Sequence, residues 1–504
     1  MVECREAVYR NHHIITMQKI FQNPSNLEQL AKSQYAIPPF LMMENAARAM
    51  ADFIIELNPE KVLILCGKGN NGGDGYALAR LLQNRCKISI FCLEEPAAEE
   101  AKVQYEACRR LGLEFTDTIE KASVIVDCIY GTGFHGQLPE TIKKILDTVN
   151  KSSAEKVACD IPSGLYFQAD YTITMGCQKL ALYSDKAKSS CGQIIVADLG
   201  IAREKFEAES NIYLVEAGDC QLPLRKKRAS HKGTYGHTAV MCGDKAGAAI
   251  LAATAAMNFG SGLTSLIKTK GSNLEQFKIS PSLMISDSIP KKTSCLALGS
   301  GFTNFPKEAA SSLLDWFKSY KSSNPGKSPA AVLDAGILTS PDFPQFLKEL
   351  NSFEGARIVL TPHLSELNSL LENCIKWAPE YTASLSPELI SISSLADSPE
   401  ARIQAGSFLT ALFPQTTIIM KSANTFIASG KETFIVTDGC QSLAKGGSGD
   451  ILAGLTAALL AQGYDAKTAA ISSAEHHALL SKKLGAEAYN LTPEKLLAII
   501  SENL

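Results

Sequence analysis

Five glycines lie within nine residues between an apolar stretch and a helical one. Lys61–Cys66 is apolar, the run from Gly67 to Gly75 has the sequence GKGNNGGDG, and Tyr76–Asn84 has helical spacing. A strand, a glycine-rich loop and a helix in this order are typical of α/β proteins whose backbone N–H groups bind phosphate. The asparagines and Asp74 add oxygen acceptors, which suit a sugar hydroxyl or a hard cation. A strand-to-helix turn without a ligand is the alternative.

This run fits neither the GxGxxG fingerprint nor the GxxxxGK[ST] phosphate loop. The sequence therefore disfavours an ordinary dehydrogenase and a P-loop enzyme.

A second glycine cluster, Gly446-Gly-Ser-Gly-Asp450, precedes the small and apolar residues Ile451–Gln462. We predict a buried helix whose first turn carries unpaired N–H groups. An aspartate at such a turn can act as a general base while the amides stabilise phosphoryl oxygens. The alternative is an aspartate that only caps the helix. Two separate glycine-rich anion sites imply two active centres.

Length and composition agree with two large domains. The chain has 504 residues, 45% hydrophobic and 20% charged, and a net charge of −3. Because basic residues are scattered, we expect neither nucleic acid nor a membrane as a partner. The 14 cysteines are dispersed without a CxxC pair, and no signal peptide or membrane-spanning run is visible. We expect buried free thiols and a cytoplasmic protein.

In the first half, apolar strand-like runs alternate with helical ones, which indicates a parallel sheet covered on both faces. The expected strands are Lys61–Cys66, Lys87–Leu93, Ser123–Tyr130 and Lys156–Ile161, and the expected helices are Ser25–Glu56, Tyr76–Asn84, Ala97–Leu111 and Pro139–Asn150. In such sheets, ligands bind beyond the carboxyl ends of the strands.

The residue composition changes around Val215–Lys232, where Gly, Pro and a basic cluster occur, and this indicates a linker. The second half restarts with His237–Cys242, helical Gly247–Phe259, and strands at Leu263–Ile267, Cys295–Leu298, Ala331–Leu333, Ile358–Leu360 and Thr417–Met420. We expect a loop or insertion at Ala378–Pro399 and a hairpin at Thr425–Val436.

Motifs in both halves carry a family resemblance. GKGNNGGDGYALARLL, VDCIYGTG, CDIPSG and ADYTITMGCQK resemble the epimerase domain of the NAD(P)H-hydrate repair enzymes. HKGTYGH, GDKAGAAILAATAAMNFGSGL, LTPHLSEL and LAKGGSGDILAGLTAALLAQG resemble their dehydratase domain. The resemblance implies a Rossmann-like three-layer α/β/α epimerase domain over residues 1–218 and a ribokinase-like α/β dehydratase domain over residues 222–504.

The resemblance implies repair of hydrated NADH and NADPH (NADHX and NADPHX). The first domain would interconvert the R and S epimers. The second would dehydrate the S form with ADP as phosphoryl donor, together with magnesium, giving AMP and phosphate. A homo-oligomer is also expected.

For the epimerase half, the resemblance implies a potassium site at Asn71, Asp127 and Ser163, three oxygen donors that each lie at the end of a different expected strand. It places the catalytic group at Asp160, because epimerisation beside a ring nitrogen needs a positioned proton donor or base. A turn-capping role for Asp160 and a solvated Lys179 are the alternatives. The substrate residues implied are Asn70, Asn71, Gly72, Gly73, Asp74, Gly131, Thr132, Gly133, Phe134, His135, Gly136 and Gln137.

For the dehydratase half, the resemblance implies Asp450 as the base on the substrate hydroxyl. The implied substrate contacts are Ala248, Gly301, His363 and Asp450, and the implied nucleotide contacts are Lys421, Ser422, Ala423, Asn424, Thr425, Gly447, Ser448 and Gly449. A structural role for the lone His363 is the alternative.

Three loops depart from the family pattern. GPGLG is replaced by Gly299-Ser-Gly-Phe-Thr303, PHPGE by Pro362-His-Leu-Ser-Glu366, and KGA by Lys421-Ser-Ala423. Losing a proline or glycine changes the backbone restriction of a tight loop, but the titratable groups remain. We therefore expect activity to survive with altered affinity.

Three other functions are open from the residues alone. A ribokinase-like small-molecule kinase would release a stable phosphorylated product. An NAD-dependent oxidoreductase would change absorbance with an alcohol substrate. A non-catalytic nucleotide-binding scaffold would bind ADP and convert nothing.

Overall fold

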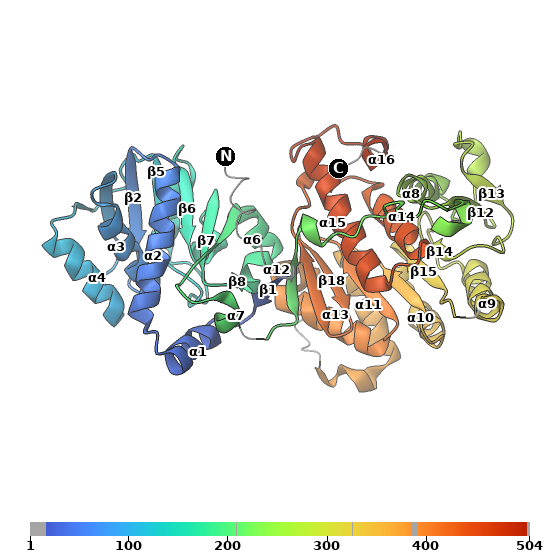
Figure 1. Cartoon of the computed structure of the whole chain (residues 1–504), viewed down its shortest axis with the longest axis horizontal. Coiled ribbons are helices and arrows are strands. Elements are labelled where there is room, and N and C mark those ends of the chain that lie inside the picture. The colour runs from blue at the N-terminus through green and yellow to red at the C-terminus, as the bar shows by residue number, and fades with distance from the viewer. Residues whose placement is uncertain (1–16, 208, 325, 385–390, 501–504) are drawn as a thin grey trace. The chain divides into compact units, whose positions relative to one another are not determined.

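The computed structural model describes residues 17–207, 209–324, 326–384 and 391–500 (Figure 1). The chain divides into two compact units, one of Lys19–Ser210 and the other of Asn211–Leu504 with Met1–Gln18. The division falls a few residues before the expected boundary at residue 218. Strand β10 (Ile212–Val215) pairs with β19 (Glu432–Val436), so it belongs to the C-terminal unit.

The N-terminal unit contains a seven-stranded parallel sheet in the order β4-β3-β2-β5-β6-β7-β9. Its strands are β2 (Lys61–Cys66), β3 (Lys87–Cys92), β4 (Phe115–Thr116), β5 (Val124–Cys128), β6 (Glu155–Cys159), β7 (Tyr171–Met175) and β9 (Gln193–Ala197), with β1 (Gln18–Phe21) paired to β8 (Gln178–Lys179). Its helices are α1 (Ser25–Tyr35), α2 (Pro39–Glu56), α3 (Asn70–Leu82), α4 (Glu99–Arg110), α5 (Glu140–Asn150), α6 (Asp185–Ser190) and α7 (Arg203–Phe206).

Two apolar layers hold this sheet. Residues of α2, α3 and α4 pack on one face, and α5 packs on the other through Ile142, Leu146 and Val149. The predicted three-layer α/β/α architecture is confirmed.

Two predicted helix boundaries in this unit were wrong. The helix expected to begin at Tyr76 begins at Asn70, so most of the glycine run is helical. The single helical stretch expected at Ser25–Glu56 is two helices, because Ala36 is left-handed and Pro38 is extended before Pro39.

The C-terminal unit is built on a sheet in the order β13-β12-β11-β14-β15-β16-β17-β18-β19-β10. Its strands include β11 (His237–Cys242), β12 (Leu263–Lys268), β13 (Met284–Ser286), β14 (Cys295–Leu298), β15 (Ala330–Leu333), β16 (Arg357–Leu360), β17 (Thr416–Met420) and β18 (Thr425–Ser429). Strands β11 to β17 pair in parallel, and β17, β18 and β19 form antiparallel hairpins, as predicted for Thr425–Val436.

The helices of this unit are α8 (Ala246–Asn258), α9 (Lys307–Ser323), α10 (Phe343–Asn351), α11 (Leu364–Trp377), α12 (Ile392–Asp397), α13 (Pro399–Leu412), α14 (Ser448–Ala461), α15 (Ala466–Leu484) and α16 (Pro493–Ile500). Small residues of α8 and α14 pack closely, since a Cβ on Gly454 would lie 2.1 Å from the Ala252 carbonyl oxygen. These helices, with α15 and α16, form a hydrophobic core with the strands of the sheet.

The stretch Ala378–Pro399 was expected to be a loop or insertion. Within its described part, a short 3₁₀ helix at Pro379–Ser384 and helix α12 are present, and α13 begins at Pro399. Ser391 and Ser398 cap α12 and α13 through their side-chain oxygens, so the serines and proline mark helix starts here. Residues 385–390 lie outside the described part.

Candidate active sites

The glycines of GKGNNGGDG mainly let helix α3 approach the sheet closely. A Cβ on Gly72 would lie 1.9 Å from the Gly67 carbonyl oxygen, and one on Gly75 would lie 2.8 Å from Cys66 Sγ and from Cys128 Cβ. Gly69 differs, because nothing lies within 4 Å of its added Cβ and it forms the N-cap of α3. The surface open to a phosphate therefore lies at Gly69, and the later glycines serve packing.

Asp160, directly after β6, is the centre of a buried polar network. Its carboxylate pairs with Lys179, and its Oδ2 accepts hydrogen bonds from Thr132 N at 3.0 Å and Thr132 Oγ1 at 2.6 Å. Asp160 and Lys179 are 8% and 3% exposed. Burial acts to raise the pKa of Asp160, but the charge of Lys179 and these hydrogen bonds outweigh it and lower that pKa. Asp160 is therefore held as a carboxylate.

Asp160 also has a left-handed backbone, with φ of 71°. Aspartate and asparagine tolerate this region better than most residues. The chain thus adopts an uncommon backbone conformation at the carboxylate predicted to be catalytic.

Asp74, in the first turns of α3, has the opposite electrostatic environment. Burial raises its pKa well above the ordinary value, and the charge of Asp160 adds to this, while Lys179 opposes it. The pair therefore combines an ionised Asp160 with an Asp74 that favours its protonated form. Two carboxyl groups whose environments separate their pKa values are suited to acid and base roles.

The three expected potassium ligands do not all contact one another. Asp127 accepts hydrogen bonds from Ser163 N at 2.8 Å, Ser163 Oγ at 2.7 Å and Ile129 N at 3.1 Å. Burial raises the pKa of Asp127 to about 6, against the effect of these bonds. Asn71 lies beside Gly131: a Cβ there would be 3.1 Å from Asn71 Oδ1 and 2.9 Å from Asp160 Oδ2. Asn71 Nδ2 is buried and has no hydrogen-bond partner among the described residues.

The loop from Gly131 to Gln137 reaches this network through Thr132. Tyr130 stacks on Phe134 with ring centroids 4.3 Å apart. Gly133, His135, Gly136 and Gln137 are exposed, so they line the outside of the site rather than its buried centre.

In the C-terminal unit, Asp450 lies in the first turn of α14, whose N-cap is Gly447 at φ of 93°. Burial raises the pKa of Asp450 to about 6, as does the charge of Asp334, whereas a hydrogen bond from Ser300 and the charge of Lys421 lower it. A carboxyl group with this pKa is ionised at neutral pH and can still accept a proton readily.

Lys421 follows β17 and faces Asp334, which follows β15. Lys421 Nζ lies 3.2 Å from Asp334 Oδ1, and Thr361 Oγ1 donates to the same oxygen at 2.5 Å. An added Cβ on Gly449 would lie 3.1 Å from Lys421 Nζ, so the ammonium group lies against the start of α14. A fixed positive charge at a helix N-terminus is suited to phosphoryl oxygens.

His363 caps helix α11 and pairs with Glu366. His363 N donates to Glu366 Oε2 at 2.9 Å, and His363 Nε2 lies 3.2 Å from Glu366 Oε1. The His363 side chain is 54% exposed, so it is accessible to a ligand. An isolated parallel bridge joins His363 to Lys421.

Ala248 and Gly301 also meet. Gly301 has a φ of 78°, and a Cβ on it would lie 3.3 Å from Ala248 Cβ. Of the predicted nucleotide residues, Ser422, Ala423 and Asn424 form the turn from β17 into β18, and Thr425 is the first residue of β18.

Five residues of these networks had no firm assignment from the sequence: Lys179, Ser300, Asp334, Glu366 and His477. Asp334 directly follows a buried strand, which is a signal that sequence reasoning could have used. Lys179 is not solvated but buried. His477, on α15, lies 3.2 Å from Ser448 Oγ through its Nε2, and nothing in its local sequence indicates this contact.

Two family models match the chain. Residues 40–181 match the model of the YjeF-related protein N-terminus, and residues 238–502, more than half of the chain, match the NAD(P)H-hydrate dehydratase model. The bifunctional NAD(P)H-hydrate repair enzyme Nnr of Helicobacter pylori is 32% identical over 511 residues, covering 96% of this chain and 100% of the relative. This chain belongs to the bifunctional NAD(P)H-hydrate repair enzymes.

Other members of the NAD(P)H-hydrate repair family are more distant. The Escherichia coli Nnr enzyme is 28% identical over 455 residues, covering 84% of this chain and 81% of the relative. The ADP/ATP-dependent NAD(P)H-hydrate dehydratase of Bacillus subtilis, co-crystallised with ATP and Mg²⁺, covers 55% of this chain and 91% of its own, with 22% identity and a TM-score of 0.42.

The family assignment confirms the predicted pairing of an epimerase domain with a dehydratase domain. In the described part of the repair enzyme, helices long and apolar enough to span a membrane are absent.

Proposed function

We propose that the two buried acid–lysine networks are the two centres of NAD(P)H-hydrate repair. The centre at Asp160 interconverts the R and S epimers, and the centre at Asp450 dehydrates the S epimer with ADP. What supports this division is that each unit holds a buried lysine–carboxylate pair beside a glycine-rich helix start: Lys179 with Asp160, and Lys421 with Asp334.

In the epimerase centre, Asp160 takes or returns a proton near the ring nitrogen, and Asp74 in its protonated form donates one. Thr132 and Lys179 orient the Asp160 carboxylate. The opposite directions in which the pKa values of the two carboxyl groups are shifted support this division of roles.

Asn71, Asp127 and Ser163 offer oxygen donors that suit a large monovalent cation, and such an ion would stabilise the ionised form of buried Asp127. When bound, potassium would supply fixed positive charge for a polar group of the substrate. We expect potassium chloride to raise the melting temperature of the parent more than choline chloride at equal ionic strength. Asn71→Ala should lose this difference; a retained difference would exclude Asn71 as a ligand.

In the dehydratase centre, the oxygen of the substrate hydroxyl attacks the β-phosphorus of ADP, and Asp450 accepts the proton of that hydroxyl. The β-phosphorus–oxygen bond to AMP breaks, and the phosphorylated hydrate then loses phosphate and a ring proton to give NAD(P)H. Lys421 and the N–H groups at Gly447–Gly449 stabilise the transferred phosphoryl oxygens. The described residues include no group of three or more Asp, Glu, His or Cys side chains able to hold a metal. Magnesium, when bound, would therefore be held largely through the nucleotide phosphates.

The decisive experiment uses chemically prepared S-NADHX, the full chain and ADP. Asp450→Asn keeps the size of the side chain but removes proton acceptance, so dehydration should slow at least about a hundredfold. Recovery of NADH absorbance gives the rate, and thermal melts and ADP titration give folding and binding. A near-normal rate in a folded variant would assign Asp450 a structural role. A stable phosphorylated product from the parent would instead favour a kinase.

The cytoplasmic location and the homo-oligomer are part of the same proposal. Support for the location comes from the cysteines, which are all free in the described part of the chain and mostly buried.

A further inference from the structure

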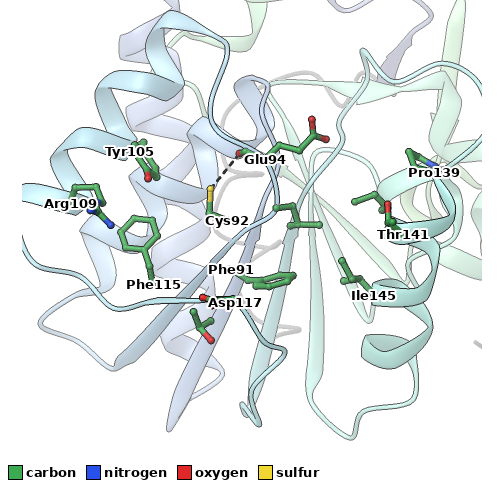
Figure 2. A pocket seen from close by; sticks show the side chains of 13 residues that line it. Phe91, Cys92, Glu94, Tyr105, Arg109, Phe115, Asp117, Pro139, Thr141 and Ile145 are labelled. Atoms are coloured by element: carbon green, nitrogen blue, oxygen red, sulfur yellow. Dashed lines mark hydrogen bonds between the residues drawn. The ribbon is translucent and has the colours of Figure 1, made fainter.

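A pocket outside the catalytic network opens at the β3–β4 edge of the N-terminal sheet (Figure 2). Its volume is about 620 Å³, which is the size of a small-molecule site. In Figure 2, Tyr105 and Phe115 lie on one side and Thr141 and Ile145 on the other. Glu94, just after β3, also lines it.

The topology of the sheet relates this pocket to the catalytic centre. With β2 counted as the first strand, β4-β3-β2-β5-β6-β7 has the order 3-2-1-4-5-6, in which a dinucleotide binds across the reversal point between the first and fourth strands. Asp160 follows the fifth of these strands, on one side of that point, and the pocket adjoins the second and third on the other side. A dinucleotide with its reacting ring at Asp160 would therefore extend toward the pocket.

The backbone between the two sites is open. Gly69 lies at the start of α3 with nothing within 4 Å of an added Cβ, so a pyrophosphate can approach its N–H groups. Neighbouring Lys68 Nζ lies 3.1 Å from Glu94 Oε2, which joins this helix start to the pocket.

The pocket residues match an adenosine group. Phe91 and Phe115 provide apolar ring surfaces, and the Arg109 guanidinium lies 5.6 Å from the centroid of Phe115. An acidic residue after the second strand is the group that binds the ribose hydroxyls in dinucleotide sites of this topology. Glu94 occupies that position, and its side chain is 42% exposed.

We propose that this pocket binds the adenosine half of the hydrate and that Glu94 accepts hydrogen bonds from its ribose hydroxyls. The epimerase centre therefore prefers NADHX to NADPHX, because the 2′-phosphate of NADPHX would face the Glu94 carboxylate. The proposal rests on the epimerase assignment above.

The test compares epimerisation of R-NADHX and R-NADPHX by the full chain without ADP, with the epimers separated by chromatography. In Glu94→Gln, the preference for NADHX, measured as the ratio of the two kcat/KM values, should fall at least about tenfold. The loss of Glu94 also frees Lys68 for the 2′-phosphate. Glu99→Gln removes the same charge from an 85% exposed side chain, and it should leave the ratio unchanged.

A second measurement needs no turnover of the second substrate. ADP-ribose should inhibit NADHX epimerisation by the parent more strongly than 2′-phospho-ADP-ribose, and Glu94→Gln should reduce this difference. The proposed pocket would be overturned if the parent epimerises NADHX and Glu94→Gln keeps both the parental preference for NADHX and the parental order of inhibition by the two ADP-ribose compounds. A folded parent that epimerises neither hydrate would instead overturn the epimerase assignment.

Discussion

At the scale of single residues, the sequence singles out the two carboxylates that we propose to be catalytic, but it does not indicate their partners. Asp160 and Asp450 belong to short motifs next to a strand end and a helix start, where ligand sites of α/β proteins occur. Asp334 meets Lys421, 87 positions later, and Lys179 meets Asp160 through a short separate strand. A single sequence carries no signal for such pairs, because only the folded sheet brings them together.

Ser300, which lies outside the expected site residues, acts on the carboxyl group that we propose as the dehydratase base. Ser300 hydrogen-bonds Asp450 and lowers its pKa, which burial has raised to about 6. Because the base works only when ionised, dehydratase kcat/KM should fall about tenfold per pH unit below 6. Ser300→Ala removes a hydrogen bond that stabilises the ionised form of Asp450, so the pKa of Asp450 should rise. The acidic limb of the variant's pH–rate profile should therefore move to higher pH.

The measurement is a pH–rate profile at saturating ADP, with Thr303→Ala as a control in the same loop. Identical acid limbs for the parent and Ser300→Ala would show that Ser300 does not tune this base.

At the scale of helices and strands, buried apolar runs located the strands well, with β2 and β14 matching to the residue. The start of α3 was misplaced because its first six residues, Asn70 to Gly75, are all polar or glycine and have low helix propensity. Close packing against the sheet overrides that propensity: the Cβ positions of Gly72 and Gly75 are already filled by neighbouring atoms.

This packing predicts a stability difference between two glycines of the same unit. Gly75→Ala would force a methyl group against Cys66 and Cys128, which should destabilise the unit by about 1–3 kcal/mol, less the gain in helix propensity. Gly133→Ala has open space and should change stability by less than about 0.5 kcal/mol. Calorimetric unfolding of the full-length variants gives both values; equal stabilities would contradict the packing role.

At the scale of the whole molecule, two glycine clusters and a change in residue composition between them predicted two compact units with separate cores. The exact position of the division was harder to predict. Strand β10 reads as the end of the first half, but its register with β19 places it in the second sheet. Pairing partners 221 positions apart are not encoded locally.

Two units with one centre each should complement one another in solution. Asp160→Asn should abolish epimerisation and retain dehydration of S-NADHX, and Asp450→Asn should do the reverse. A mixture of the two variants should convert R-NADHX fully to NADH with ADP, because the S epimer diffuses between molecules. Absorbance at the reduced nicotinamide band follows the reaction. A mixture that leaves the R epimer unconverted would contradict independent centres.

Both networks that we propose to be catalytic place a lysine–carboxylate pair inside the protein rather than on its surface. In Lys179–Asp160 the side chains are 4% and 11% exposed, and in Lys421–Asp334 they are 21% and 5% exposed. Dissolved ions screen charges that they can surround, over about 8 Å at physiological salt, and they reach buried pairs poorly. The fields that orient both reactions should therefore persist at salt concentrations where exposed pairs such as Lys102–Glu99 lose their attraction.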